Sequence, residues 1–275
     1  MKPATPEMLN REVNSPSYTF SFFDEAFLSK DELRAVRLQL EMMKPELSLK
    51  EAGIENTIAI FGSARTLEPD NAKLTITKLE RCLIDQPDEP KLLEQLRHAR
   101  RQLRQAKHYT QAYELAQAIY SHPKLIEQRV HVVTGGGPGI MEAANRGADD
   151  LGMKSIGLNI ELPFEQAPNP FITPELCFRF HYFAIRKMHF LIRTKGVIVF
   201  PGGFGTLDEL FETLTLIQTK KISPIPIILF DEDYWKGLIN FNLLIEEGMI
   251  QPEDLKLFTY ANNVHHACEV IASQF

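Results

Sequence analysis

A glycine-rich segment between an apolar run and a helical pattern carries the residues best suited to chemistry. Residues 196–200 (GVIVF) are mostly apolar, residues 201–206 (PGGFGT) contain three glycines, and apolar residues then recur at helical spacing up to Ile217. This order predicts a buried strand, a tight loop and an amphipathic helix. The first amides of a helix lack internal partners and lie at the positive end of its dipole, so this loop is suited to phosphate. The residues expected to hold it are Gly202, Gly203, Gly205 and Thr206.

The spacing of Thr206 and Glu209 allows two interpretations. Thr-x-x-Glu is the pattern of a capping box, in which the hydroxyl and the carboxylate satisfy backbone amides and do no chemistry. Alternatively, Glu209 is a carboxylate that acts on the ligand held by the loop. The spacing alone favours neither interpretation.

Two further loops follow strand patterns of the same kind. Residues 56–61 (NTIAIF) lead into 62–65 (GSAR), and residues 129–134 (RVHVVT) lead into 135–139 (GGGPG). Ligands of open α/β sheets bind at the carboxyl ends of parallel strands, so we expect these loops to join the same site. The residues that this adds are Ser63, Gly135, Gly136, Gly137 and Gly139. Neither glycine loop has the Gly-x-Gly-x-x-Gly pattern of NAD-binding proteins, and the Walker A pattern of NTPases is absent.

Three separated motifs occur in one order: residues 135–141 (GGGPGIM), Arg186-Lys187 and residues 201–209 (PGGFGTLDE). In this order they resemble the Lonely Guy (LOG) family of nucleoside 5′-monophosphate phosphoribohydrolases, over roughly residues 54–270. The resemblance implies a hydrolase that cleaves the N-glycosidic bond of a purine nucleoside 5′-monophosphate. AMP or an N6-modified AMP, as in cytokinin biosynthesis, would give free base and ribose 5-phosphate.

The resemblance also implies roles for single residues. Glu209 would stabilise the positive charge that develops on the ribose, hold a sugar hydroxyl or activate water, and these three roles stay open. Arg186 would orient the phosphate or ribose and lower the pKa of Glu209, with Lys187 beside it at the substrate. No metal or organic cofactor is needed, and the protein is expected to be a homodimer or a higher homo-oligomer.

The sequence departs from the family pattern at two places. Glu142 stands where short family members have glycine, and Phe183-Ala184 replaces Met-His before the Arg-Lys pair. The second change bears on recognition of the base more than on catalysis. Glu142 is the next candidate for the catalytic carboxylate.

Two rival functions are compatible with the same scaffold. A non-catalytic nucleotide or cofactor carrier is the main alternative, because a fold does not determine a function. A pyridoxal-phosphate decarboxylase, an older label for such proteins, would need a Schiff-base lysine, and no lysine here has a recognisable context for one.

Composition places bounds on the partners and on the compartment. The chain has 275 residues, of which 44% are hydrophobic and 24% charged, as in soluble globular proteins. The net charge of −6 argues against general nucleic-acid or acidic-membrane binding. Three widely spaced cysteines, no signal-peptide pattern and no membrane-length apolar run favour a cytoplasmic protein.

Strand and helix patterns alternate from residue 54 onward. They predict an α/β fold with a doubly wound, mostly parallel, Rossmann-like sheet over residues 54–275. Residues 1–53 are expected to form an N-terminal extension with one helix, which Pro45 should end. Near the C-terminus the pattern predicts one helix over residues 234–248.

A helical insertion is expected over about residues 70–120. Pro87 and Pro90 divide it into a helical hairpin. Basic residues recur along it at three- and four-residue steps: Arg97, Arg100, Arg101, Arg104 and Lys107. Such a stripe is more often a solvated face paired with nearby acids than an anion site for regulation, and both interpretations stay open.

Overall fold

The computed structural model of the chain describes residues 5, 8, 10, 13–163 and 167–275. These form two compact units, Met1–Lys44 and Pro45–Phe275. The first unit contains the 3₁₀ helices Pro16–Tyr18 and Asp31–Leu33, helix α2 (Glu25–Leu28) and the first part of α3 (Arg34–Glu51). Among the described residues, no helix is both long enough and apolar enough to cross a membrane.

Helix α3 does not end at Pro45, contrary to the sequence-based expectation. It continues to Glu51 with Pro45 buried inside it. Side chains beyond the proline are anchored: Leu49 is buried in a hydrophobic core, and Glu46 accepts hydrogen bonds from the guanidinium of Arg193. These tertiary contacts favour continuation of the helix, at the cost of the backbone hydrogen bond that a proline removes.

The second unit is built on a seven-stranded sheet whose neighbouring strands are all parallel. The strand order is β4-β3-β2-β1-β5-β6-β7. The strands are β1 (Asn56–Phe61), β2 (Val130–Thr134), β3 (Ser155–Ile160), β4 (Cys177–Phe180), β5 (Thr194–Val199), β6 (Ile227–Phe230) and β7 (Thr259–Ala261). The prediction of an α/β fold with a parallel, doubly wound sheet is therefore confirmed.

Helices cover both faces of this sheet, because the central strands alternate their apolar side chains between two cores. From β1, Ile58 and Ile60 join the core built with α6 (Lys107–Ser121), α8 (Ile140–Asp149) and α13 (Val264–Ala272). Ala59 and Phe61 join the opposite core. Its helices are α9 (Phe183–Ile192), α10 (Phe204–Gln218), α11 (Glu232–Leu238) and α12 (Phe241–Glu246).

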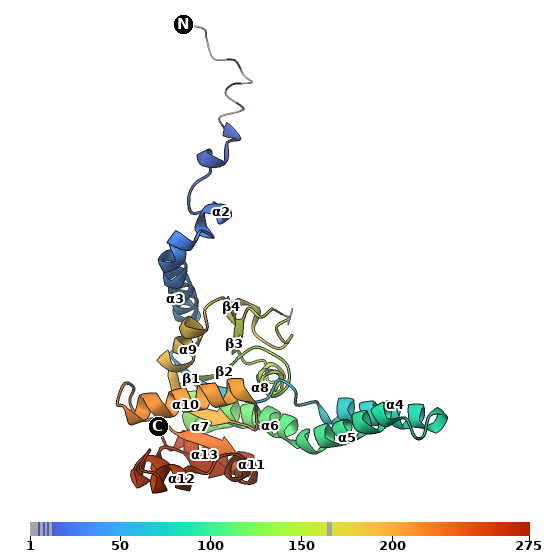
Figure 1. Cartoon of the computed structure of the whole chain (residues 1–275). Helices are drawn as coiled ribbons and strands as arrows, with labels where there is room; N and C mark the ends of the chain where they lie inside the picture. The colour runs from blue at the N-terminus through green and yellow to red at the C-terminus, as the bar shows by residue number, and fades with distance from the viewer. Residues whose placement is uncertain (1–4, 6–7, 9, 11–12, 164–166) are drawn as a thin grey trace. The chain divides into compact units, whose positions relative to one another are not determined.

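The expected helical hairpin consists of α4 (Pro69–Asp85) and α5 (Pro90–Gln105). The two helices pack side by side and extend away from the sheet (Figure 1). Both begin with a proline at the first helical position, where its missing amide is not needed. The rest of the expected insertion is α6, which packs on α8 in the core and leads through α7 (Pro123–Glu127) to β2.

The C-terminal helix expected over residues 234–248 is divided into α11 and α12. Asn240 lies between them, and its side chain accepts a hydrogen bond from the amide of Leu243 at 3.1 Å. The reason for the break is local, since asparagine favours the N-cap over the helix interior. After α12, the 3₁₀ helix Pro252–Leu257 leads into β7.

Candidate functional site

The site lies where the strand order changes direction. The chain runs from β1 outward to β4 and then crosses to β5 on the other side of β1, which leaves a crevice at the carboxyl ends of β1 and β5. Backbone hydrogen bonds join the loops here: the amide of Ser63 donates to Pro201 at 3.1 Å, and the amide of Ile140 donates to Ser63 at 3.1 Å. The three loops predicted from the sequence to converge are therefore held together.

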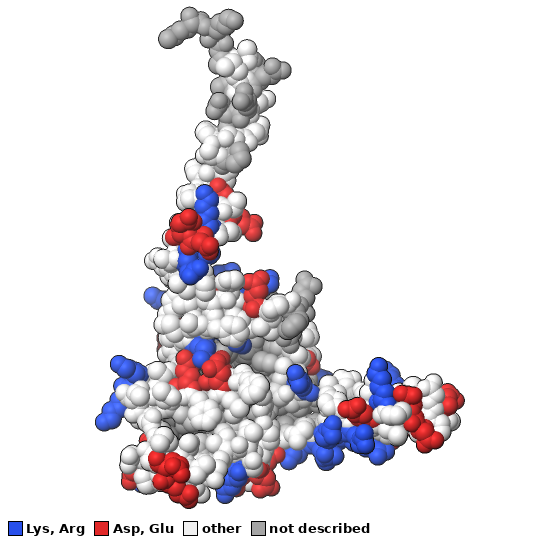
Figure 2. Space-filling model, in the orientation of Figure 1, with Lys and Arg blue, Asp and Glu red and all other residues white. Residues whose placement is uncertain are grey.

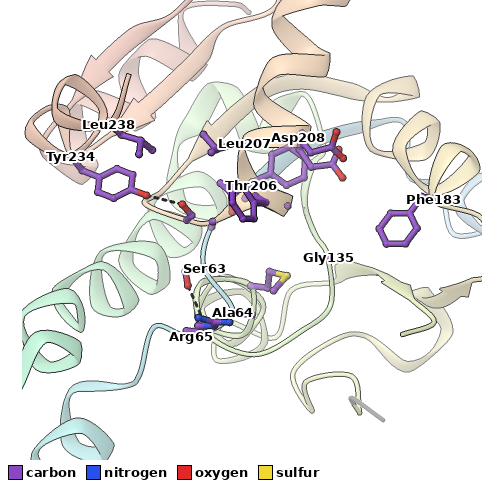
Figure 3. A pocket seen from close by; sticks show the side chains of 18 of the residues that line it. Ser63, Ala64, Arg65, Gly135, Phe183, Thr206, Leu207, Asp208, Tyr234 and Leu238 are labelled. Atoms are coloured by element: carbon purple, nitrogen blue, oxygen red, sulfur yellow. Dashed lines mark hydrogen bonds between the residues drawn. The ribbon is translucent and has the colours of Figure 1, made fainter. Parts of the chain in front are cut away.

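A cavity of about 680 Å³ opens at this crevice. Figure 3 shows Tyr234 and Leu238 on one side of it, Phe183 on the opposite side and Ser63 between them. The described residues that line it are Phe61, Gly62, Ser63, Ala64, Arg65, Gly135, Met141, Phe183, Arg186, residues 202–209, Tyr234 and Leu238.

The start of α10 excludes the capping-box interpretation. The helix begins at Phe204 with Gly203 as its N-cap, so Thr206 lies inside the first turn and is not the capping residue. The first amides of α10 therefore lie at the cavity wall without helix carbonyls to bond. Together with Gly202, Gly203 and Gly205, they form the positive end of a helix that opens onto a ligand-sized space.

Arg186 reaches the cavity from the first turns of α9. Its Nε donates to the carbonyl of Leu158 in β3 at 2.6 Å, and its guanidinium lies 5.1 Å from the ring centre of Phe190. Gly135 makes room for it, since a Cβ at that position would come within 2.7 Å of the Arg186 Nη2. Burial lowers the pKa of Arg186, and the charge of Glu209 opposes this effect. The guanidinium is thus a fixed cation in the cavity wall.

Glu209 lies one turn beyond the loop and is only 8% exposed, although it lines the cavity. Its carboxylate forms no hydrogen bond or ion pair with the residues that the structure describes. Burial raises its pKa to about 7, and the attraction of Arg186 only partly offsets that effect. Arg186 lowers the pKa of Glu209, as expected, but burial raises that pKa by more. Glu209 is therefore a carboxyl group that can change protonation near neutral pH.

Lys187 is adjacent to Arg186 in sequence but does not line the cavity. Its Nζ lies 3.0 Å from the carboxylate of Asp208 and 3.1 Å from that of Glu212, both on α10. Burial opposes the charged form of Lys187, but its bonds to Asp208 and Glu212 outweigh burial and raise its pKa. Lys187 joins α9 to α10 on the outer side of the site.

The glycines of the loop after β2, residues 135–139, fall into two groups. Gly135 lines the cavity, whereas Gly136, Gly137 and Gly139 do not. The carbonyls of Gly136 and Gly137 accept hydrogen bonds from Asn169 at 2.9 and 3.0 Å. Gly139 has φ +73°, and a Cβ there would come within 2.4 Å of the Ser63 carbonyl oxygen. Gly139 thus allows the close contact between the loops after β1 and β2.

Glu142 does not line the cavity either. Its Oε1 accepts a hydrogen bond from the hydroxyl of Tyr109 in α6 at 2.8 Å.

Tyr234 and Leu238, by contrast, line the cavity and were missed by sequence reasoning. Tyr234 donates to the carbonyl of Gly202 at 2.7 Å and so braces the glycine loop (Figure 3). Its position just after β6, another parallel strand, was the available signal.

The donors needed for a metal or for pyridoxal phosphate are not assembled in the part of the chain that the structure describes. No group of three or more His, Cys, Asp or Glu side chains there could hold a metal ion. The described residues that line the cavity include no lysine for a Schiff base. The polar groups that do converge include backbone amides, the guanidinium groups of Arg65 and Arg186, and the carboxyl groups of Asp208 and Glu209, of which Glu209 is buried.

Comparison with known proteins assigns the chain to a family. The family model described as "Possible lysine decarboxylase" matches residues 141–271. Cytokinin riboside 5′-monophosphate phosphoribohydrolase LOG7 of Arabidopsis thaliana is 30% identical over 152 residues, which is 53% of this chain and 68% of that protein. LOG3 of the same plant is 31% identical over 135 residues, or 47% of this chain and 60% of that protein. The chain belongs to this LOG family.

A solved structure gives a weaker match. The X-ray structure titled TM1055, a structural genomics target, aligns with a TM-score of 0.47 at 15% identity. The alignment covers 79% of this chain and 99% of that one.

Proposed function

We propose that this chain is a phosphoribohydrolase that hydrolyses the N-glycosidic bond of a purine nucleoside 5′-monophosphate, AMP or an N6-modified AMP. Water adds to the anomeric carbon, the bond to the base breaks, and the products are free base and ribose 5-phosphate. The named activities of the plant relatives support this class of substrate.

The observation that carries the proposal is the placement of Glu209. Its carboxyl group is 8% exposed, has no hydrogen-bond or ion-pair partner among the described residues and lines a ligand-sized cavity. Burying such a group lowers the stability of the fold, so a purely structural role does not explain it. Its pKa of about 7 suits a group that exchanges protons or charge with a substrate at neutral pH.

The geometry supports a division of roles. The 5′-phosphate would lie against the first amides of α10 and the Thr206 hydroxyl, which are suited to an anion. The ribose would then lie between Arg186 and Glu209. In its ionised form Glu209 stabilises the oxocarbenium-like charge of the sugar or takes a proton from the attacking water, and Arg186 favours that form.

The base would occupy the more apolar part of the cavity. Phe183 lines it, on the side of the cavity opposite Tyr234 and Leu238 (Figure 3). Phe183 stands where the family has methionine, and an aromatic ring offers a surface on which a purine can stack. This composition supports a planar base without selecting one purine.

The decarboxylase activity in the family description fits this cavity poorly. Lysine decarboxylation with pyridoxal phosphate requires a lysine that reaches the cofactor. Lys187, the lysine next to Arg186, is held by Asp208 and Glu212 outside the described lining residues.

Base release from a nucleotide panel tests the proposal. Purified protein incubated with AMP, GMP, IMP and N6-modified AMP should release one or more bases together with an equimolar amount of ribose 5-phosphate. The Glu209→Gln variant is the matched control for contaminating nucleosidases. Tight binding of these nucleotides without any base release would favour the nucleotide-carrier alternative and overturn the proposal.

A further inference from the structure

A second cavity, of about 260 Å³, lies beside the first. The two cavities share Ser63, Arg65, Gly202 and Tyr234 as lining residues. Helix α5 of the inserted hairpin forms the outer wall of the second cavity. The α5 residues that line it are spaced three and four apart and therefore lie on one face of the helix. These residues are His98, Arg101, Gln102 and Gln105.

The lining of the second cavity is cationic. Arg65 comes from the loop after β1 and Arg101 from α5, with His98 one turn before Arg101. The described lining residues include no aspartate or glutamate, although the chain carries a net charge of −6. Apart from Pro201 and Gly202, the other lining residues carry hydrogen-bonding side chains: Ser63, Thr66, Gln102, Gln105 and Tyr234. This combination of guanidinium, amide and hydroxyl groups matches the oxygens of a phosphoryl group.

Two other cations of the basic stripe have acidic partners, but the cations that line the cavity do not. Arg100 lies 3.1 Å from Glu80, and Lys107 lies 3.0 Å from Asp231. Arg65, His98 and Arg101 form no side-chain hydrogen bond or ion pair with any described residue. Figure 2 shows Lys and Arg side chains gathered over α5, where the hairpin leaves the sheet domain. The stripe is thus partly a solvated, paired face and partly a wall of unpaired charge.

We propose that the second cavity, between the glycine loop and α5, is a subsite that binds a phosphoryl group next to the nucleotide cavity. The group is either a further phosphate of the bound nucleotide or a separate inorganic anion. Both sources share the chemistry that Arg65 and Arg101 recognise, and the shared wall at Gly202 and Tyr234 brings either one beside the substrate. In this assignment the function of the inserted hairpin is to supply the α5 side of the anion subsite, including Arg101.

Calorimetric titration of the full chain with inorganic pyrophosphate tests the subsite directly. At about 0.15 M salt, where exposed charges are screened beyond about 8 Å, Arg101→Gln should weaken pyrophosphate binding by about tenfold or more. Arg104→Gln is the matched control, because Arg104 lies on the same helix outside the described lining residues. It should change the affinity by less than about twofold. Equal weakening by both variants, or no binding to the unaltered chain, would overturn the proposal.

Nucleotide titrations distinguish the two sources, and this arm rests on the proposed function. With Glu209→Gln, which should slow turnover by about 10²–10⁴, ADP should bind more tightly than AMP if the phosphoryl group belongs to the nucleotide. Adding Arg101→Gln should then abolish that advantage. If the anion is separate, pyrophosphate should still bind in the presence of saturating AMP and remain sensitive to Arg101→Gln. Failure of Glu209→Gln to bind AMP would count against the proposed function and leave the pyrophosphate result standing.

Discussion

The buried carboxyl group of Glu209 affects stability as well as chemistry. Its pKa is raised from 4.5 to about 7 in the folded protein, chiefly by burial, so the folded state binds a proton more tightly than the unfolded state does. The free energy of unfolding therefore falls as pH rises from about 4.5 to about 7, and the full cost of about 3 kcal/mol is present above that range.

Glu209→Gln should consequently stabilise the protein in mild alkali. We expect a higher free energy of unfolding than for the unaltered chain at about pH 8, by up to about 3 kcal/mol, and little difference at about pH 5. Thermal or denaturant unfolding of both proteins at the two pH values measures this. A capping residue would give the opposite result, a loss of about 0.5–2 kcal/mol.

The same substitution should separate chemistry from binding. Glutamine keeps the size of the side chain but cannot carry the negative charge, so kcat should fall by about 10²–10⁴. AMP affinity should stay close to that of the unaltered protein, because the phosphate loop is intact. Single-turnover rates and equilibrium binding on one preparation give both quantities. A near-normal kcat would remove Glu209 from the catalytic role.

Helices α9 and α10 set the charge environment of that carboxyl group. Arg186 and Lys187 are consecutive, and consecutive residues point about 100° apart on a helix. Arg186 therefore lines the cavity while Lys187 contacts Asp208 and Glu212. Lys187 lowers the pKa of Glu209, and Glu212 raises it.

Two substitutions at this junction should shift the pH dependence of activity in opposite directions. If ionised Glu209 is the active form, kcat/KM should rise with pH through a midpoint of about 7. Lys187→Gln should move the midpoint to higher pH, and Glu212→Gln to lower pH. Both variants remove the Lys187–Glu212 contact, so a purely structural effect would change them alike. Midpoints that move together would contradict the electrostatic role.

The first turn of α10 should make the enzyme selective for nucleotides over nucleosides. Hydrogen bonds to a charged phosphate contribute roughly 1.5–3 kcal/mol each, so losing two of them corresponds to about 10²–10⁴ in kcat/KM. Adenosine should be a poorer substrate than AMP by that factor, measured as base release at low substrate concentration. Equal turnover of the two compounds would contradict phosphate binding at Gly202–Thr206.

The predictable and unpredictable parts of the site differ in physical origin. The glycine loops after β2 and β5 can be predicted from the sequence, because local sequence determines where a strand ends, a turn forms and a helix begins. The position of Tyr234 just after β6 could have been predicted, but its contact with Gly202 and the wall formed by α5 depend on how distant segments pack, which no local pattern specifies. Likewise, Pro45 predicts a helix end, but the tertiary contacts of Leu49 and Glu46 favour continuation of α3. The break between α11 and α12 at Asn240 has a local cause and could have been predicted from the sequence.

At the level of the whole molecule, the exposed face of α3 bears on assembly. Val36, Leu40 and Met43 of α3 are 39%, 51% and 46% exposed, and Leu33, at the end of the preceding 3₁₀ helix, comes three residues before Val36. Steps of three, four and three residues match the apolar seam of a coiled coil. A second copy of the chain would bury this seam, which water would otherwise contact.

We therefore expect a homodimer in solution, with α3 in the interface. Leu40→Glu places a charge in the seam and should shift the protein towards monomer, measured by light scattering across a concentration series. Gln39→Glu adds the same charge at an exposed position one residue away, outside the seam, and should leave the dimer intact. Loss of the dimer in both variants would indicate a general charge effect. A monomeric mass for the fully active, unaltered chain would exclude the dimer as a requirement for activity.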